Sequence, residues 1–163
     1  MRHEVEAQWI GGMEFRADVN GHTIVMDAPE RAGGGDKGPI PKPLMLAALA
    51  GCTGMDVAAL LRKAGKPADS FSLKVTGEIS AKPPIVYEAI HVEYDFTGAE
   101  PDLEAALDAV TRSQEQFCGV SRMLKAIMPV TWSIRYNGRT LFDNRPDSRT
   151  PSQGAQPALS RAA

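Results

Sequence analysis

Two cysteines, Cys52 and Cys118, are the residues of this chain best suited to covalent chemistry. Each lies next to a glycine, and a long stretch of sequence separates them. A thiolate is a nucleophile, and two thiols that come close together can act as redox partners by forming a disulfide. The alternative is that both side chains are small buried hydrophobic groups that do no chemistry. The spacing alone leaves both interpretations open.

Cys52 lies in an apolar run, LAALAGCTGMDV (46–57), between Gly51 and Gly54. Glycine inside a helix costs about 1 kcal/mol relative to alanine, so this pair predicts a site where another group comes close to the helix. Asp56 follows one turn later and would oppose a thiolate at Cys52 if it points the same way. We therefore expect activation of Cys52 to come from elsewhere, most simply from an arginine of a loop or of another subunit.

Three apolar residues share the expected helical face of Cys52, namely Met45, Leu49 and Met55. They could line a substrate pocket, or they could belong to the core, and the spacing does not separate the two.

Cys118 has a different local context. The sequence Cys118-Gly119-Val120 leads into a new helix, and the free amides at the start of a helix lower the pKa of a thiol. The sequence therefore predicts an activating environment for Cys118.

The first 27 residues read as a strand meander in which two glycine-containing turns, Gly11-Gly12 and Asn20-Gly21, separate three alternating segments. A loop rich in glycine and proline follows at 29–43. From Leu44 to about Ala64 nearly every residue is apolar or small, with Pro43 as the expected first helical residue. A helix that is apolar on all sides is a buried one, so we expect a central core helix and not a membrane span.

Clean apolar alternation predicts half-buried, antiparallel strands at 71–80, 90–96 and 130–136, with a last short strand at 140–142 after a tight turn. Between the second and third of these strands, the segment 101–118 has helical periodicity. Its expected inner face is formed by Leu103, Leu107, Val110 and Phe117, with a break at Gly119 and a short helix at 120–127. The pattern predicts the α+β class.

Composition excludes several classes of partner. The chain has 163 residues and a formal net charge of −2, which gives no field that would recruit nucleic acid or an anionic membrane. The N-terminus lacks the continuous apolar core of a signal peptide, so we expect a cytoplasmic protein. Residues 143–163 are rich in proline, serine and glutamine and are expected to form a disordered tail after a single domain at 1–142.

The remaining candidates for a binding site are weak. His3, His22 and His91 fall on predicted strands or a turn, and the sequence contains neither Cys-x-x-Cys nor His-x-x-x-His. We therefore expect no metal site and no cofactor. Trp9 and Trp132 lie on apolar strand faces, where core or interface packing is the expected role.

Two segments, GPIPKPLMLAALAGCTGMDVAALLRKAG (38–65) and FCGVSRML (117–124), resemble the OsmC/Ohr superfamily of thiol peroxidases. The order of the expected elements also fits that superfamily over about residues 5–142. The resemblance implies an OsmC-like fold in which antiparallel sheets wrap around buried central helices. It also implies an intertwined homodimer with active sites at the dimer interface, where Gly51 and Gly54 would permit close helix approach.

The same resemblance implies a thiol-dependent peroxidase that reduces organic hydroperoxides to alcohols. Cys52 would be the peroxidatic cysteine and Cys118 the resolving one, and an external small-molecule or protein dithiol would reduce their disulfide. The alternative, from a different functional class, is a non-catalytic OsmC-like protein that binds a hydrophobic small molecule at the dimer interface.

The sequence departs from that superfamily's pattern in one respect. Well-characterised members have a glutamate just before the central helix that pairs with an activating arginine, whereas this chain has Pro41-Lys42-Pro43 there. Three cations are candidates for stabilising the thiolate: Arg16 in the second strand, Arg31 in the glycine-rich loop, and Lys42.

Overall fold

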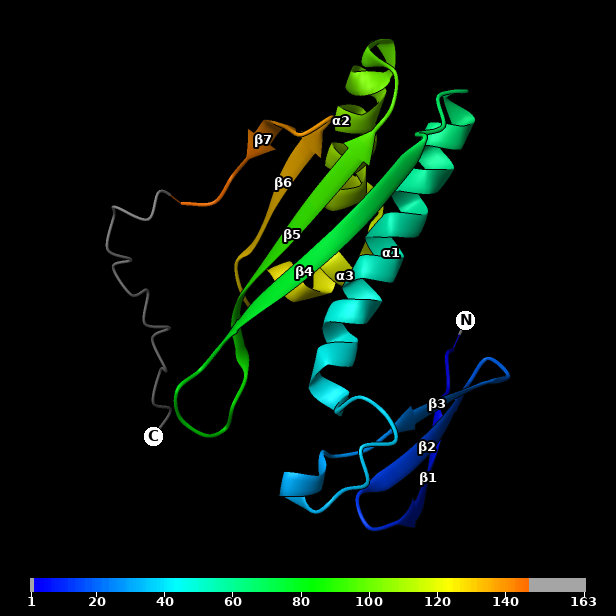
Figure 1. The fold of residues 1–163 in the computed structure, drawn as a ribbon, viewed down its shortest axis with the longest axis vertical. Helices are drawn as coiled ribbons and strands as arrows, with labels where there is room; N and C mark the ends of the chain where they lie inside the picture. Colours follow the sequence, from blue (N-terminus) through cyan, green and yellow to red (C-terminus); the bar gives the residue numbers. More distant parts are fainter. Residues whose placement is uncertain (1, 147–163) are drawn as a thin grey trace, which may run out of the picture.

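The computed structural model describes residues 2–146, which form two β-sheets and a group of helices (Figure 1). The strands and α-helices, in chain order, are β1 (Glu6–Gly11), β2 (Glu14–Val19), β3 (His22–Met26), α1 (Pro41–Lys63), β4 (Ser70–Ile79), β5 (Tyr87–Thr97), α2 (Leu103–Arg112), α3 (Gly119–Lys125), β6 (Val130–Tyr136) and β7 (Arg139–Asp143). A π-helical turn, Ser113–Phe117, joins α2 to the segment that leads into α3. The predicted α+β class is confirmed.

The N-terminal meander forms a separate antiparallel sheet in the order β1-β2-β3. Asn20 and Gly21 both have positive φ, at 54° and 78°, as a tight hairpin turn requires. The sheet lies beyond the N-terminal end of α1, apart from the larger sheet (Figure 1). We call this sheet, together with the loop 27–40 that follows it, the N-terminal arm.

The loop of the N-terminal arm is fixed by one buried carboxylate. Asp27 accepts hydrogen bonds from the backbone amides of Ala28, Gly35 and Lys37, at 2.8, 2.9 and 3.2 Å. These three bonds hold the pKa of Asp27 below its usual range although burial works against them. Most of the large apolar side chains of the arm nevertheless lie exposed, namely Trp9, Ile10, Met13, Phe15, Ile24 and Ile40.

The larger sheet has the order β4-β5-β6-β7. Its β4–β5 and β6–β7 pairs are antiparallel as predicted, but β5 and β6 run parallel, so the expectation of purely antiparallel sheets is wrong at this pair. The reason is the connection, since α2, the π-helical turn and α3 carry the chain back along one face of the sheet before β6 begins. A crossover of that kind returns the chain in the same direction.

The core lies between the larger sheet and the three helices. From β5, alternate residues Val92, Tyr94 and Phe96 are fully buried, and Ile134 of β6 is buried beside them. α1 contributes four buried residues at intervals of four positions, Leu49, Thr53, Val57 and Leu61. This interval places one stripe of the helix against the sheet.

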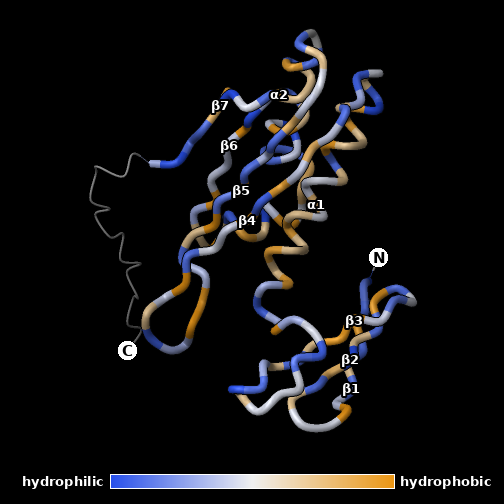
Figure 2. Tube along the Cα trace, in the orientation of Figure 1, coloured by the Kyte–Doolittle hydropathy of each residue, from blue (hydrophilic) through white to orange (hydrophobic). Residues whose placement is uncertain are grey.

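The other side of α1 is open. The helix begins at Pro41, two residues before the predicted first residue, Pro43, and Ile40 before it is extended. Its side chains opposite the buried stripe remain exposed, and Met55 is 71% accessible. The expected burial on all sides therefore holds for one face only within a single chain, although apolar residues follow the helix along its length (Figure 2). Among the described residues, α1 is also the one helix long and apolar enough to cross a membrane, by length and composition alone.

The segment predicted as one helix at 101–118 is divided. α2 ends at Arg112, and the π-helical turn that follows contains more residues per turn than an α-helix. This change in periodicity turns Phe117 away from the core, where it is 50% exposed, so its assignment to the inner face is wrong. The break also falls at Cys118, whose backbone is extended, and Gly119 is the first residue of α3.

At the C-terminal end, β7 runs to Asp143, one residue beyond the predicted domain boundary. The Asn144 side chain accepts a hydrogen bond from the amide of Trp132 at 2.7 Å. Most of the predicted tail, residues 147–163, lies outside the described part of the chain.

Candidate active site

The two cysteines meet between α1 and the start of α3. The sulfur atoms of Cys52 and Cys118 and a carboxylate oxygen of Asp56 all lie within 4.8 Å of one another. Both cysteines are free thiols; Cys52 is half-buried and Cys118 is buried. The fold therefore brings two thiols that are distant in sequence to within reach of each other, with a carboxylate beside them.

Cys118 is the N-cap residue of α3, and its sulfur accepts a hydrogen bond from the amide of Ser121 at 3.3 Å. The predicted contact with a helix start is present, but its predicted effect is not. Burial raises the pKa of the Cys118 thiol to about 11, the Ser121 amide lowers it, and the neighbouring Cys52 and Asp56 raise it further. The expectation of an activating environment for Cys118 is therefore wrong, because desolvation outweighs the helix amide.

A buried hydrogen-bond network positions the segments that carry the thiols. The Thr53 hydroxyl bonds to the Tyr94 hydroxyl and lies 2.8 Å from the Ser113 hydroxyl. Gln114 donates to Tyr94 at 2.7 Å and accepts from Ser121 at 2.7 Å. The network thus joins α1, β5, the π-helical turn and α3. Burial raises the pKa of Tyr94 to about 12, so this hydroxyl remains protonated at neutral pH.

The π-helical turn opens the surface next to Cys118. A cavity of about 220 Å³ is lined by the backbone and side chains of residues 114–119 together with Arg122. The ammonium of Lys125 donates to the carbonyl of Gln114 at 2.7 Å and lies 4.5 Å from the centre of the Trp132 ring. Sequence reasoning did not consider Arg122, since its position on α3 gives no signal before the turn is known.

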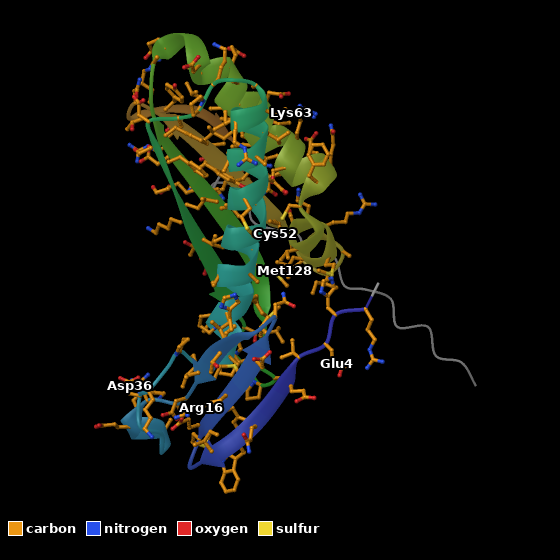
Figure 3. All side chains as sticks on the ribbon, turned by 90° about the vertical axis from the view of Figure 1, so that its right-hand side faces the viewer. Glu4, Arg16, Asp36, Cys52, Lys63 and Met128 are labelled. Carbon is orange, nitrogen blue, oxygen red and sulfur yellow. The ribbon has the colours of Figure 1, made fainter. Side chains whose placement is uncertain are left out.

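None of the three candidate cations is brought to Cys52 within the chain. Arg16 lies on the N-terminal arm, away from Cys52 on α1 (Figure 3), and pairs with Glu14 at 2.9 Å. Arg31 is exposed in the loop of the arm. Lys42 donates to the carbonyl of Ile85, and ten residues of helix, about 15 Å, separate it from Cys52.

The three predicted pocket residues have different environments. Leu49 is fully buried and belongs to the core, whereas Met55 is 71% exposed. Met45 lines a cavity of about 370 Å³ between the start of α1, the β4–β5 connection and the end of α3. The other residues that line this cavity are Lys42, Ile85, Val86, Tyr87, Ile127 and Met128.

The two glycines beside Cys52 have different surroundings. A Cβ atom at Gly54 would lie 3.3 Å from Leu73 of β4, so this glycine allows α1 to pack closely on the sheet. A Cβ atom at Gly51 would meet nothing within 4 Å. Gly51 therefore faces open space on the exposed side of α1, next to the thiol.

Comparison with known proteins identifies the family. The family model described as "OsmC-like protein" matches residues 33–133, which include both cysteines. The chain belongs to the OsmC-like family. It is 30% identical to Protein YhfA of Escherichia coli (strain K12) over 131 residues, which are 80% of this chain and 95% of that protein.

Solved structures agree with this assignment. A hypothetical protein from Aquifex aeolicus VF5 has 25% identity and a TM-score of 0.68, covering 84% of this chain and 98% of its own. An organic hydroperoxide resistance protein OsmC from Legionella pneumophila has 17% identity and a TM-score of 0.62, covering 83% of this chain and 97% of its own. The latter identity supports a shared fold and no more.

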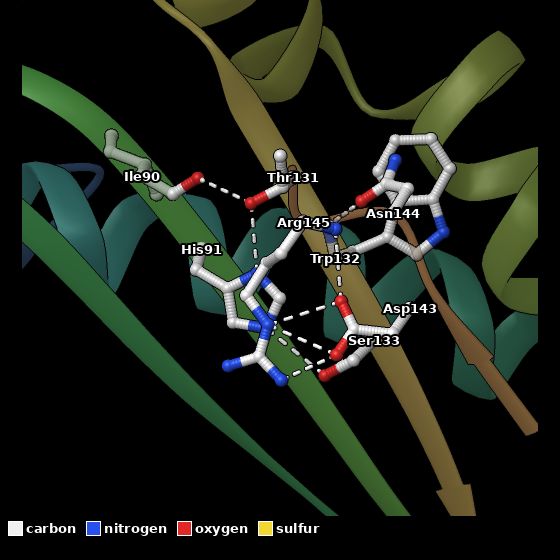
Figure 4. Close-up of polar contacts among 8 residues, drawn as sticks. All are labelled: Ile90, His91, Thr131, Trp132, Ser133, Asp143, Asn144 and Arg145. Atoms are coloured by element: carbon white, nitrogen blue, oxygen red, sulfur yellow. Dashed lines mark hydrogen bonds and ion pairs between the residues drawn. The ribbon is translucent and has the colours of Figure 1, made fainter. Parts of the chain in front are cut away.

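A second polar cluster lies on the other face of the larger sheet, away from the helices (Figure 4). The His91 ring nitrogens lie 2.9 Å from the Thr131 hydroxyl and 3.0 Å from the Ser133 hydroxyl, and Asp143 and Arg145 form an ion pair beside them. Burial and the Arg145 charge lower the pKa of His91. With both ring nitrogens engaged by hydroxyls of β6, His91 serves to join β5 to β6.

Proposed function

We propose that the protein is a thiol-dependent peroxidase that reduces organic hydroperoxides to alcohols. The observation that carries the proposal is the approach of the Cys52 and Cys118 sulfurs to within 4.8 Å. In the first step the Cys52 thiolate attacks the O–O bond, which gives a sulfenic acid and, after protonation, the alcohol. In the second step the Cys118 thiol condenses with the sulfenic acid, releasing water and forming a disulfide. An external dithiol then reduces the disulfide.

The different burial of the two thiols supports this division of roles. Cys52 is half-buried and accessible to a peroxide, whereas Cys118 is 3% exposed. The raised pKa of Cys118, about 11, keeps it a thiol at neutral pH until a sulfenic acid forms beside it. A resolving cysteine needs proximity more than prior ionisation, because its target is an electrophilic sulfur.

An apolar cavity near the thiols supports the choice of organic hydroperoxides as substrates. Met45, which lies two turns before Cys52 on α1, lines the cavity of about 370 Å³ together with Ile85, Ile127 and Met128. Apolar walls favour the hydrocarbon part of an organic hydroperoxide and offer little to hydrogen peroxide.

We further propose that the active unit is a homodimer in which the N-terminal arm packs on the partner. The arm leaves Trp9 63% exposed, and the open side of α1 leaves Met55 71% exposed. A second copy that covers both surfaces would remove a large apolar area from water. Within one chain Arg16 and Cys52 are apart (Figure 3). In such a dimer, Arg16 of one chain would instead reach Cys52 of the other.

The chemistry is tested by intact mass and thiol counting after one equivalent of cumene hydroperoxide. Reduced wild-type protein should lose two hydrogens and both thiols. Cys118→Ser should retain an oxidised Cys52, and Cys52→Ser should lose all turnover. Turnover that survives in Cys52→Ser contradicts the proposal.

The donation of Arg16 across the dimer is tested by mixing two inactive variants. Arg16→Met chains keep Cys52, and Cys52→Ser chains keep Arg16, so only a mixed dimer combines both at one site. Random pairing of equal amounts should restore about a quarter of wild-type activity, since half of the dimers are mixed and each has one complete site. Activity that stays at the level of the separate variants contradicts donation in trans.

One observation favours a second candidate, a non-catalytic protein that binds a hydrophobic small molecule. The cavity beside Met45 is lined mainly by apolar side chains, and within residues 2–146 the three candidate cations lie elsewhere than at Cys52. This candidate predicts that both thiols stay free after one equivalent of peroxide. It also predicts that an apolar fluorophore binds in the cavity of the wild type, and that Met45→Trp, which fills the cavity, weakens this binding.

A further inference from the structure

The site between α1 and α3 holds a third potential ligand that the peroxidase proposal does not use. Asp56 lies one helical turn after Cys52 on α1, so its carboxylate projects on the same side of the helix as the thiol. Its oxygen and the two sulfurs are within 4.8 Å of one another. Two thiols alone would suffice for a disulfide, and a carboxylate next to a thiolate disfavours the peroxidase chemistry.

The three atoms are only slightly farther apart than the ligand atoms of a bound metal ion. In a tetrahedral zinc site, with Zn–S bonds of about 2.3 Å and Zn–O bonds of about 2.1 Å, neighbouring ligand atoms are about 3.5 to 3.8 Å apart. Separations of at most 4.8 Å require a movement of about 1 Å to reach this geometry. Side-chain rotation of Cys52 and Asp56, both only half-buried, can supply it.

The atoms around the cluster hold two of the ligands in place. The Ser113 hydroxyl donates to a carboxylate oxygen of Asp56 at 3.1 Å, and the Ser121 amide donates to the Cys118 sulfur at 3.3 Å. Metal ligands in proteins are characteristically oriented by such second hydrogen bonds. Ser113 also belongs to the buried network with Thr53, so the carboxylate is tied to the same framework as the thiols.

We propose that Cys52, Asp56 and Cys118 of the reduced protein bind one thiophilic divalent ion, of the Zn²⁺ or Cd²⁺ class. Two sulfur ligands select soft and borderline ions over Mg²⁺ and Ca²⁺, and three protein ligands leave the fourth position to water. Binding forms two metal–sulfur bonds and one metal–oxygen bond, releases the two thiol protons, and transfers no electrons. While the ion is bound, neither sulfur is available to a peroxide.

The inference rests on the proposed function only because both use the same two thiols, and it adds a way in which that site could be regulated. The ion and the peroxide both react with the reduced thiols, so they compete for the same form of the protein. The metal-bound protein should therefore resist oxidation until a chelator removes the ion. Asp56 has a role under this inference, because its negative charge stabilises the metal complex.

The test is a titration of the full-length, reduced, chelator-treated protein with Cd²⁺ under anaerobic conditions, followed by the thiolate-to-metal charge-transfer absorbance. We expect saturation at one ion per chain, release of two protons per ion, displacement by Zn²⁺ and no displacement by excess Mg²⁺. Asp56→Asn should weaken Cd²⁺ binding by at least about tenfold, and Ser113→Ala should weaken it by a smaller factor.

The matched control is Asp108→Asn, which removes an exposed carboxylate of α2 that pairs with Arg112 at 3.3 Å, away from the thiols. Its Cd²⁺ affinity should equal that of the wild type. The inference is overturned by the absence of a saturable band in fully reduced protein, by an Asp56→Asn affinity equal to that of the wild type, or by one ion shared between two chains. Peroxide oxidation is measured separately on the metal-free protein, so failure of the peroxidase proposal and failure of metal binding are distinguishable.

Discussion

The hydroxyl oxygens of Thr53 and Ser113 lie 2.8 Å apart, and this contact links the residue after Cys52 to the π-helical turn that leads to Cys118. Both side chains are fully buried. A buried polar pair is costly unless each group has its partners, and here Tyr94 and Asp56 supply the others. The distance between the two thiols is therefore maintained by polar contacts in the core as well as by the helices.

Removal of one hydroxyl from this network should loosen the thiol pair. Tyr94→Phe leaves the Gln114 side-chain amide without its acceptor and removes one of the two hydroxyl partners of Thr53. We therefore expect the free energy of unfolding to fall by about 1–3 kcal/mol. Disulfide formation between Cys52 and Cys118 after peroxide addition should also slow. Urea unfolding and timed thiol trapping measure the two effects.

The control for this variant is Tyr136→Phe. The Tyr136 hydroxyl is also buried and donates to the carbonyl of Ala99 at 2.7 Å, but it does not belong to the network around the thiols. Its loss should lower stability by a similar amount and leave the rate of disulfide formation unchanged. Equal slowing in both variants would show that global stability, and not the network, governs the approach of the thiols.

The free energy of unfolding of the reduced protein should fall at alkaline pH because of Cys118. Burial raises its pKa from an ordinary value of 9.0 to about 11. Above pH 9 the unfolded chain loses this proton while the folded chain keeps it, so the stabilisation is complete below pH 9 and disappears as the pH approaches 11. The fall in unfolding free energy should reach about 2–3 kcal/mol.

The measurement compares urea unfolding of wild type and Cys118→Ala between pH 8 and pH 11, with reductant present. The variant has no thiol at this position and should show a correspondingly shallower decline. Parallel curves for the two proteins would mean that Cys118 is not protected from ionisation in the folded state.

Local signals in the sequence were sufficient for the N-terminal strands and for α1. Asn20-Gly21 adopts the two positive φ angles that the hairpin needs, and Pro41 and Pro43 lie in the first turn of α1, where proline is favourable. These features depend on a few adjacent residues. The same is true of the strands with clean alternation, whose inner residues on β5 are buried as their period predicts.

Features that depend on contacts across the chain were not predictable in this way. Nothing in the alternation of β5 and β6 specifies a parallel pairing, since the side-chain period is the same in either direction. The π-helical turn cannot be recognised from Leu103, Leu107 and Val110, which fit an ordinary helix. The proximity of Asp56 to both thiols also depends on how α3 packs against α1. The spacing of residues along the sequence therefore gave no indication of a third ligand.

The loop of the N-terminal arm offers a test of close backbone packing. A Cβ atom at Gly38 would overlap the carbonyl oxygen of Val25 on β3, and the backbone there cannot move without disturbing the sheet. At Gly35 the nearest atom is a carboxylate oxygen of Asp27 at 3.4 Å, which is an ordinary contact. Gly38→Ala should therefore destabilise the arm by about 1–3 kcal/mol, and Gly35→Ala by less.

Hydrogen exchange measured by mass spectrometry locates the effect. Gly38→Ala should raise exchange in peptides that cover 22–40 and leave peptides from β5 and β6 unchanged, because the arm and the larger sheet have separate hydrogen-bond ladders. Uniformly raised exchange would instead mean that the arm and the rest of the chain unfold as one unit.

The proposed dimer makes a specific prediction at Gly51. Within one chain a Cβ atom at this position meets no atom within 4 Å, so Gly51→Leu should stabilise α1 by up to about 1 kcal/mol through helix propensity. In a dimer with paired α1 helices the same leucine would keep the helices apart, and we expect dimer affinity to fall by at least about tenfold. Glu104→Leu, which adds an exposed leucine to α2, is the control and should leave the dimer intact. Sedimentation velocity at several concentrations distinguishes the two variants. A dimer of unchanged affinity in Gly51→Leu would mean that the exposed side of α1 packs on something other than a second copy of itself.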